Sequence, residues 1–205
     1  MPFYTPNAFR MNEQELIDGL IIQTKDAIQY LVNTYQKNVI KTAYYFVSNM
    51  EDAEDISQEV FLEAIHSIKR YRKKSSLYTW IYRITVNRSL DHLRKQKRRN
   101  FLYQIGTFMQ ISNEGRNKNQ QEPSTTDTGN EENEKRAVIE NAIGSLPENQ
   151  RIAFILSKYD ELAYKEIADI MNLSISSVES LIHRAKINLQ HKLVIYFSEY
   201  AKAKK

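Results

Sequence analysis

Apolar residues recur at helical spacing through most of the chain, and they predict two groups of helices separated by a long polar segment. Residues 12–48 carry enough apolar positions at this spacing for two helices. In the next segment, Ile56, Val60, Ala64 and Ile68 follow at steps of four, and this face is expected to be core. A basic loop interrupts the pattern at Arg72–Ser76. A further helix is predicted from about Tyr78 to the Lys/Arg cluster that ends at Arg99.

The character of the chain changes between residues 100 and 136, where Asn, Gln, Ser, Thr, Gly and Glu dominate. This composition predicts a flexible linker. Helical periodicity returns at Ala137, and Ser145-Leu146-Pro147-Glu148 has the form of a helix start. We therefore predict an N-terminal extension (1–10), a first domain (11–99), the linker (100–136), a second domain (137–197) and a tail (198–205).

Composition supports an all-α fold of two small helical domains. The chain has 205 residues but five Gly and four Pro, which are too few for an architecture of strands and turns. It has no Cys, which excludes disulfides, thiolate metal sites and a cysteine nucleophile. Its first ten residues lack an apolar core of signal-peptide length, and no run approaches the ~20 apolar residues of a membrane span. A cytoplasmic protein is expected.

Charge is distributed unevenly along the chain. Residues 1–68 hold four Lys/Arg against ten Asp/Glu, whereas residues 69–99 hold twelve against one. A basic block of this kind favours a polyanion, because each neutralised phosphate releases condensed counterions. A solvated tail is the alternative, but Trp80, Ile81, Ile84, Leu90 and Leu93 are interleaved with the charges and need a folded surface.

Within the basic block, Arg83, Asn87, Arg94 and Arg98 are spaced at i, i+4, i+11 and i+15, which places them within about 60° of each other around a helix. Arg88 and Lys95 flank this stripe. Arg suits phosphate contacts, and Asn offers a paired donor and acceptor to a base. A solvated helix face is the competing explanation and could hold for Asn87 alone, but four aligned residues beside a basic loop favour DNA contact.

The loop that precedes this helix is small-residue and cationic, so it could hold an unstacked base against backbone and hydroxyl groups. Its residues, with the two that flank them, are Tyr71, Arg72, Lys73, Lys74, Ser75, Ser76 and Leu77.

The segment from Tyr164 to Leu189 has the layout of a helix-turn-helix. Ala168 is small where two helices would touch, Asn172 suits a left-handed turn, and Val178 and Leu181 anchor the second helix, which Ser174 could cap. Polar side chains predicted to face DNA from this helix are Ser176, Ser177, Glu179, Ser180, His183, Arg184 and Lys186. Ser176 and Glu179 also match a capping box, and the two roles are equally supported.

Four motifs resemble the signatures of the extracytoplasmic-function (ECF) sigma factors, in that family's order and across nearly all of residues 11–193. They are D-I-S-Q-E-V-F (55–61), Y-T-W-I-Y-R-I-T-V-N (78–87), S-L-P-E-N-Q-R (145–151) and Y-K-E-I-A-D-I-M (164–171). The resemblance implies a factor that docks on core RNA polymerase. Its first domain would melt the minus-ten promoter element, with Asn87 at the upstream edge of that element and residues 71–77 capturing a base. Its second domain would read the minus-thirty-five element.

By the same resemblance, an acidic helix spanning residues 52–66 lies against the coiled coil of the largest polymerase subunit. The polymerase-binding residues would be Asp52, Asp55, Gln58, Glu59 and Leu62. Such factors are usually held inactive by an anti-sigma factor, often at the membrane. Two departures alter the expected promoter sequence: Glu179 and Leu181 stand where many members carry Arg, and Lys73-Lys74 replaces a commoner Gly-Asp.

The two promoter elements lie roughly 70 Å apart, at ~35 Å per DNA turn. The relaxed linker would span only about 33 Å, at ~5.5 Å × √n. We infer that the polymerase sets the spacing and that the free factor binds promoter DNA weakly.

Two other classes of protein compete with this interpretation. An autonomous helix-turn-helix regulator would bind duplex DNA tightly as a symmetric dimer without polymerase. A nuclease could use Glu51, Asp52, Glu54 and Asp55, but these carboxylates lack a nearby histidine or turn glycine. We expect no enzymatic activity, no cofactor, no metal and no small-molecule substrate.

Overall fold

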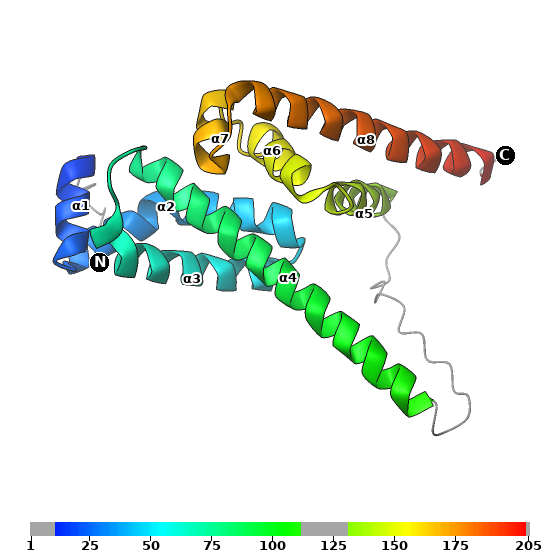
Figure 1. Cartoon of the computed structure of the whole chain (residues 1–205), viewed down its shortest axis with the longest axis horizontal. Helices are drawn as coiled ribbons and strands as arrows, with labels where there is room; N and C mark the ends of the chain where they lie inside the picture. Colours follow the sequence, from blue (N-terminus) through cyan, green and yellow to red (C-terminus); the bar gives the residue numbers. More distant parts are fainter. Residues whose placement is uncertain (1–10, 112–130, 204–205) are drawn as a thin grey trace, which may run out of the picture.

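The computed structural model describes residues 11–111 and 131–203, and within them the chain forms only helices (Figure 1). The all-α prediction is confirmed. The elements are α1 (Glu13–Ile21), α2 (Lys25–Val47), α3 (Met50–Ser67), a 3-10 turn (Ile68–Arg70), α4 (Leu77–Ile111), α5 (Glu131–Gly144), α6 (Glu148–Lys158), α7 (Tyr164–Met171) and α8 (Ile175–Ala203).

The first group of helices, α1–α4, packs around a core to which every helix contributes. The predicted face of α3 is buried, with Ile56, Val60, Ala64 and Ile68 each no more than 2% exposed. Polar caps begin the helices: the Asn12 side chain accepts from the Glu15 amide, the Thr24 hydroxyl from the Ala27 amide, and the Asn49 side chain from the Asp52 amide. Since each cap satisfies an otherwise unpaired amide, the polar sequence between the apolar runs fixes where these helices begin.

The second group, α5–α8, holds a helix-turn-helix formed by α7 and α8. Asn172 ends α7 in the left-handed conformation (φ 54°, ψ 48°), as predicted for the turn. The Ser174 hydroxyl accepts from the Ser177 amide at 3.2 Å and so caps α8. Ala168 and Val178 are both buried where the two helices meet.

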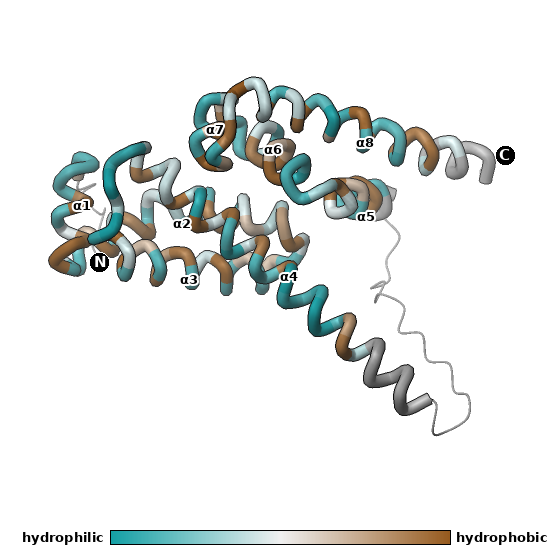
Figure 2. Tube along the Cα trace, in the orientation of Figure 1, coloured by the Kyte–Doolittle hydropathy of each residue, from teal (hydrophilic) through white to brown (hydrophobic). Residues whose placement is uncertain are grey.

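The two groups of helices are in contact with each other. Helix α4 packs against α7, and α2 packs against α6. Phe46, Tyr82, Val86 and Leu90 of the first group are buried in the same apolar cluster as the interior of α6–α8. In Figure 2, α6 and α7 lie above α2 and α4, and both helices contain hydrophobic segments. Helix α4 therefore carries apolar residues on two sides and is covered on both.

Helices extend further than the sequence pattern predicts. Helix α4 continues past Arg99 to Ile111, α5 begins at Glu131, and α8 continues through Ala203, so both ends of the predicted linker and most of the predicted tail are helical. Residues 100–103 contain no Pro or Gly, and adding a residue to an existing helix costs little. The extension 1–10 and the centre of the linker, 112–130, lie outside the described residues. In the described part of the chain, no helix is both long and apolar enough to cross a membrane.

Candidate nucleic-acid interface

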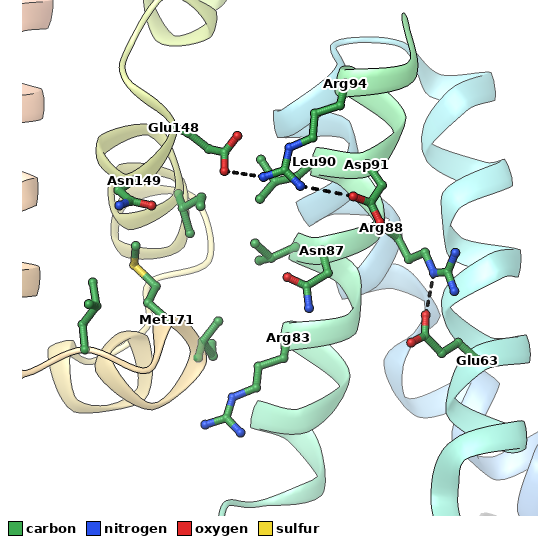
Figure 3. Close-up of a pocket in the computed structure, with 14 residues that line it drawn as sticks. Glu63, Arg83, Asn87, Arg88, Leu90, Asp91, Arg94, Glu148, Asn149 and Met171 are labelled. Carbon is green, nitrogen blue, oxygen red and sulfur yellow. Dashed lines mark hydrogen bonds and ion pairs between the residues drawn. The ribbon is translucent and has the colours of Figure 1, made fainter. Parts of the chain in front are cut away.

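The stripe on α4 is formed largely as the sequence predicts. Arg83, Asn87 and Arg94 line one side of a cleft of about 520 Å³. In Figure 3 they follow one another along α4, with Glu148, Asn149 and Met171 of the second group opposite. Asn87 and Arg94 are exposed and Arg83 is half-buried. Three polar side chains of the kind that contact phosphates and base edges thus share one face.

Arg88 lines the same cleft, but its guanidinium points toward α3 and Glu63 (Figure 3). Its Nε donates to Glu63 of α3 at a distance of 2.5 Å, and its Nη1 lies 3.7 Å from Glu59. The hydrogen bond with Glu63 raises the pKa of Arg88 above its ordinary value, and burial opposes that shift. The structure therefore ties Arg88 to the acidic helix, whereas the sequence places it among the residues that contact the minus-ten element.

The loop between the 3-10 turn and α4 is held by short local contacts. The Tyr71 ring lies 5.2 Å from Trp80 between centroids, and its hydroxyl donates to the Ser75 carbonyl. Burial and the neighbouring Glu13 raise the pKa of Tyr71 to about 12, so its hydroxyl stays a donor. The Ser76 hydroxyl accepts from the Thr79 amide at 3.1 Å and so serves as a cap at the start of α4.

Cationic side chains of this loop remain exposed at Arg72, Lys73 and Lys74. Lys73 adopts a left-handed backbone (φ 53°), a conformation that glycine adopts more readily than lysine. Leu77 differs from the rest, because its side chain is completely buried in the first core. The structure thus assigns Leu77 to the support of the loop and removes it from the surface predicted to meet DNA.

The outer face of α8 presents the polar residues named by the sequence. Ser176, Glu179, Ser180, His183, Arg184 and Lys186 are exposed and Ser177 is half-buried. Leu181 packs against the core as predicted. Because the cap of α8 is Ser174, the capping-box alternative for Ser176 and Glu179 does not apply, and the carboxylate of Glu179 is on the open face.

The acidic helix α3 exposes Asp55, Gln58 and Glu59, with Leu62 57% exposed among them. Asp52 is half-buried and lies 3.4 Å from Nε2 of His92 on α4. Beside Leu62 runs a groove of about 590 Å³ that α2 and α3 form together. The sequence prediction missed the α2 side of this groove, formed by Val32, Gln36 and Ile40. The sequence offers no signal for this side of the groove, because helical spacing alone does not tell an exposed apolar position from a buried one.

Among the described residues, no group of three or more His, Asp or Glu side chains is placed to hold a metal ion. Three of the carboxylates at the start of α3, those of Glu51, Glu54 and Asp55, are exposed on one side of the helix, whereas Asp52 turns toward His92. Their arrangement gives no geometric support to the nuclease alternative.

A helix-turn-helix joined to a helical domain with a basic stripe is an arrangement typical of proteins that act in transcription. Residues 31–99 match the family described as Sigma-70 region 2, and residues 136–189 match Sigma-70, region 4. The chain is 30% identical to the ECF RNA polymerase sigma-E factor of Haemophilus influenzae, over 91% of this chain and 97% of that protein. It is also 30% identical to the protein of the same description from Escherichia coli K12, over 90% and 95%. The chain belongs to the ECF sigma factors and is an alternative sigma factor.

Two solved structures share this fold. The structure of CnrH in complex with the cytosolic domain of CnrY has a TM-score of 0.64 at 19% identity, covering 89% of this chain and 97% of CnrH. The sigma factor RpoE of Bartonella quintana, in complex with the anti-sigma factor NepR, has a TM-score of 0.56 at 20% identity, covering 84% of this chain and 99% of that one. Both similarities concern the fold.

Proposed function

We propose that this sigma factor binds core RNA polymerase through α3, melts the minus-ten element with the α4 stripe and the 71–76 loop, and reads the minus-thirty-five element with α8. One observation carries the proposal: two exposed polar surfaces suited to DNA lie on separate helical domains of one chain. A symmetric regulator would need only α7 and α8, and it would give no role to the stripe on α4 or to the acidic helix α3. Transcription takes place in the cytoplasm of a bacterium, and we place the protein there.

We further propose an anti-sigma factor as a partner, by analogy with RpoE, which was solved bound to one. The chain supplies a surface for such a partner at the groove between α2 and α3, where half-buried apolar residues lie beside Leu62. Because the polymerase-binding residues border the same groove, an occupant there would compete with polymerase.

The decisive experiment compares DNA binding with and without core polymerase, by gel shift on promoter fragments. We expect weak binding by the free protein and a large gain when core polymerase is added. Tight binding by the protein alone, with no gain from polymerase, would identify an autonomous regulator and contradict the proposal.

Charge reversal on α3 is expected to act on polymerase binding first. Replacing Asp55→Lys and Glu59→Lys together should weaken the affinity for core polymerase at least about tenfold, because like charges brought together across an interface cost several kcal/mol. Fluorescence anisotropy of labelled factor measures this affinity. The matched control is Asp18→Lys with Asp26→Lys, two exposed acids on α1 and α2 that lie outside the proposed interface. Equal loss in both pairs would show a general effect of net charge.

Asn87→Ala is expected to act on transcription instead. The loss of one paired base contact costs about 1–3 kcal/mol, so multi-round transcription from a cognate promoter should fall about tenfold while polymerase affinity stays within twofold. Asn38→Ala on α2 removes an exposed asparagine elsewhere and should change neither quantity. If polymerase affinity falls together with transcription, the assignment of polymerase binding to α3 and promoter binding to α4 is wrong.

Arg184→Ala tests the reading of the minus-thirty-five element. A bidentate contact with guanine predicts a cost of about 1–3 kcal/mol that is confined to one base pair. Competition between promoter variants, substituted one base pair at a time, measures the loss at each position. A uniform loss across all variants would instead place Arg184 on a phosphate.

A further inference from the structure

We propose that the free factor holds itself closed, with α6 and α7 packed on α2 and α4 so that the second domain covers the α4 stripe until the domains separate. This inference rests on the proposed role of the stripe in DNA binding. It adds a regulatory element that needs no second protein, because the covering surface belongs to the same chain.

Two cations of the stripe are already occupied by the second domain. Arg83 donates from Nε to the backbone carbonyl of Asp169 at 2.8 Å, and its Nη2 donates to the same oxygen. Arg94 forms an ion pair with Glu148 at 2.7 Å. Asn87 lies between them and faces the cleft toward α6 and α7 (Figure 3). Arg94 keeps 58% of its side chain exposed, so a DNA strand would have to displace these contacts to bind the two arginines.

A second set of contacts joins α2 to the end of α6. The Tyr45 and Tyr159 rings stack with centroids 3.8 Å apart. The Thr42 hydroxyl donates to Asp160 at 2.9 Å, and Lys41 Nζ donates to the Tyr159 carbonyl. Phe46 is buried in the same cluster. These contacts lie apart from the stripe, so they can be altered without touching any residue assigned to DNA or polymerase.

The closed arrangement also desolvates two charged side chains, Arg151 and Asp160, and the cost of removing them from water favours opening. Arg151 is 7% exposed, and its guanidinium lies 5.9 Å from the centre of the Phe46 ring. Burial lowers its pKa, and in the described residues its Nε has no hydrogen-bond partner. Asp160 is desolvated as well, which raises its pKa to about 6 against the opposing effects of Thr42 and Lys41. Both groups regain water when the domains part, and this hydration offsets part of the free energy that holds the domains together.

Closure can be measured directly, because the chain has no cysteine and two can be introduced for dyes. Lys37→Cys on α2 and Gln190→Cys on α8 are exposed positions on the two domains. We expect energy transfer between the dyes to be high in the free factor and to fall on addition of core polymerase. Low transfer in the free factor would overturn closure, and it would leave the promoter function, measured with polymerase, as it stands.

A pair of variants with opposite expected effects tests the covering of the stripe. Tyr45→Ala with Thr42→Val should lower energy transfer and raise the affinity of the free factor for a fluorescein-labelled single-stranded DNA of mixed sequence. Releasing two arginines should also steepen the slope of log affinity against log salt by about 1.4, at ~0.7 for each phosphate contact. Asp160→Asn keeps the acceptor for Thr42 and removes the buried charge, so it should raise transfer and weaken DNA binding.

Controls separate this inference from the proposed function. Adding Arg83→Ala and Arg94→Ala to the opened variant should abolish its gain in affinity and in salt slope, while circular dichroism confirms that all variants are folded. A fall in energy transfer without any change in DNA affinity or salt slope would overturn the inference, since the contact would then mask nothing. The proposed function is tested separately: if polymerase carrying the Asn87→Ala factor transcribes normally, the proposed role of the α4 stripe in promoter binding is wrong.

Discussion

Leu156→Ala is expected to lower the free energy of unfolding of the second domain by about 2–5 kcal/mol, the usual cost of truncating a buried leucine. Leu156 is fully buried on α6, in the cluster that also contains Ile155, Ile167 and Ile182. A helical unit of this size has a small reserve of stability. The variant should therefore unfold at a temperature lower by about 10 °C or more, and promoter-dependent transcription should fall with it.

Thermal denaturation followed by circular dichroism at 222 nm measures this effect. Leu173→Ala is the matched control, because Leu173 belongs to the same domain but is 40% exposed, and it should change stability by less than about 0.5 kcal/mol. An unchanged melting curve for Leu156→Ala would mean that α6 is not packed in the interior as described.

The closed arrangement is expected to weaken as pH rises from 5 to 7.5. Burial raises the pKa of Asp160 from 3.8 to about 6, so the closed form binds a proton more tightly than the open form does. Closure is accordingly most stable below about pH 4, loses stability between the two pKa values, and is least stable above about pH 6. Over the whole range the loss is about 3 kcal/mol, and between pH 5 and 7.5 it corresponds to roughly a tenfold change in the ratio of closed to open forms.

Energy transfer between dyes on the two domains, recorded against pH, measures this change. The groups that face Asp160 are Lys41 and Thr42 of α2, and Tyr78 and Tyr82 of α4, whose pKa values burial raises above the ordinary value. The raised pKa values keep both tyrosine hydroxyls neutral between pH 5 and 7.5. The Asp160→Asn variant should therefore give a flat profile, and a profile that persists in this variant would assign the change to another group.

Local patterns in the sequence were sufficient to predict where helices occur and the turn between α7 and α8, although α4, α5 and α8 extend beyond their predicted ends. The steps of four from Ile56 to Ile68 describe a face that is buried as predicted, and Asn172 adopts the left-handed conformation expected of it. Each of these features depends on residues within a few positions of one another, where spacing and backbone preference decide the outcome.

Contacts between distant parts of the chain could not be predicted in this way. Thr42 and Asp160 are 118 positions apart, and neither residue type signals a partner. Arg88 was grouped with the stripe on helical spacing alone, although two glutamates of α3 stand beside it. One signal was available: Ile81 and Ile84 face the first core while Tyr82, Val86 and Leu90 face the second, and a helix that is apolar on two sides needs two coverings.

The length of α4 has a mechanical consequence. As one continuous helix of 35 residues, it spans about 52 Å at 1.5 Å per residue, and its distal turns project beyond the rest of the first domain (Figure 1). A rod of this length turns a small tilt of the first domain into a large displacement of its far end. The position of the last turns of α4 is therefore a sensitive measure of how that domain is oriented.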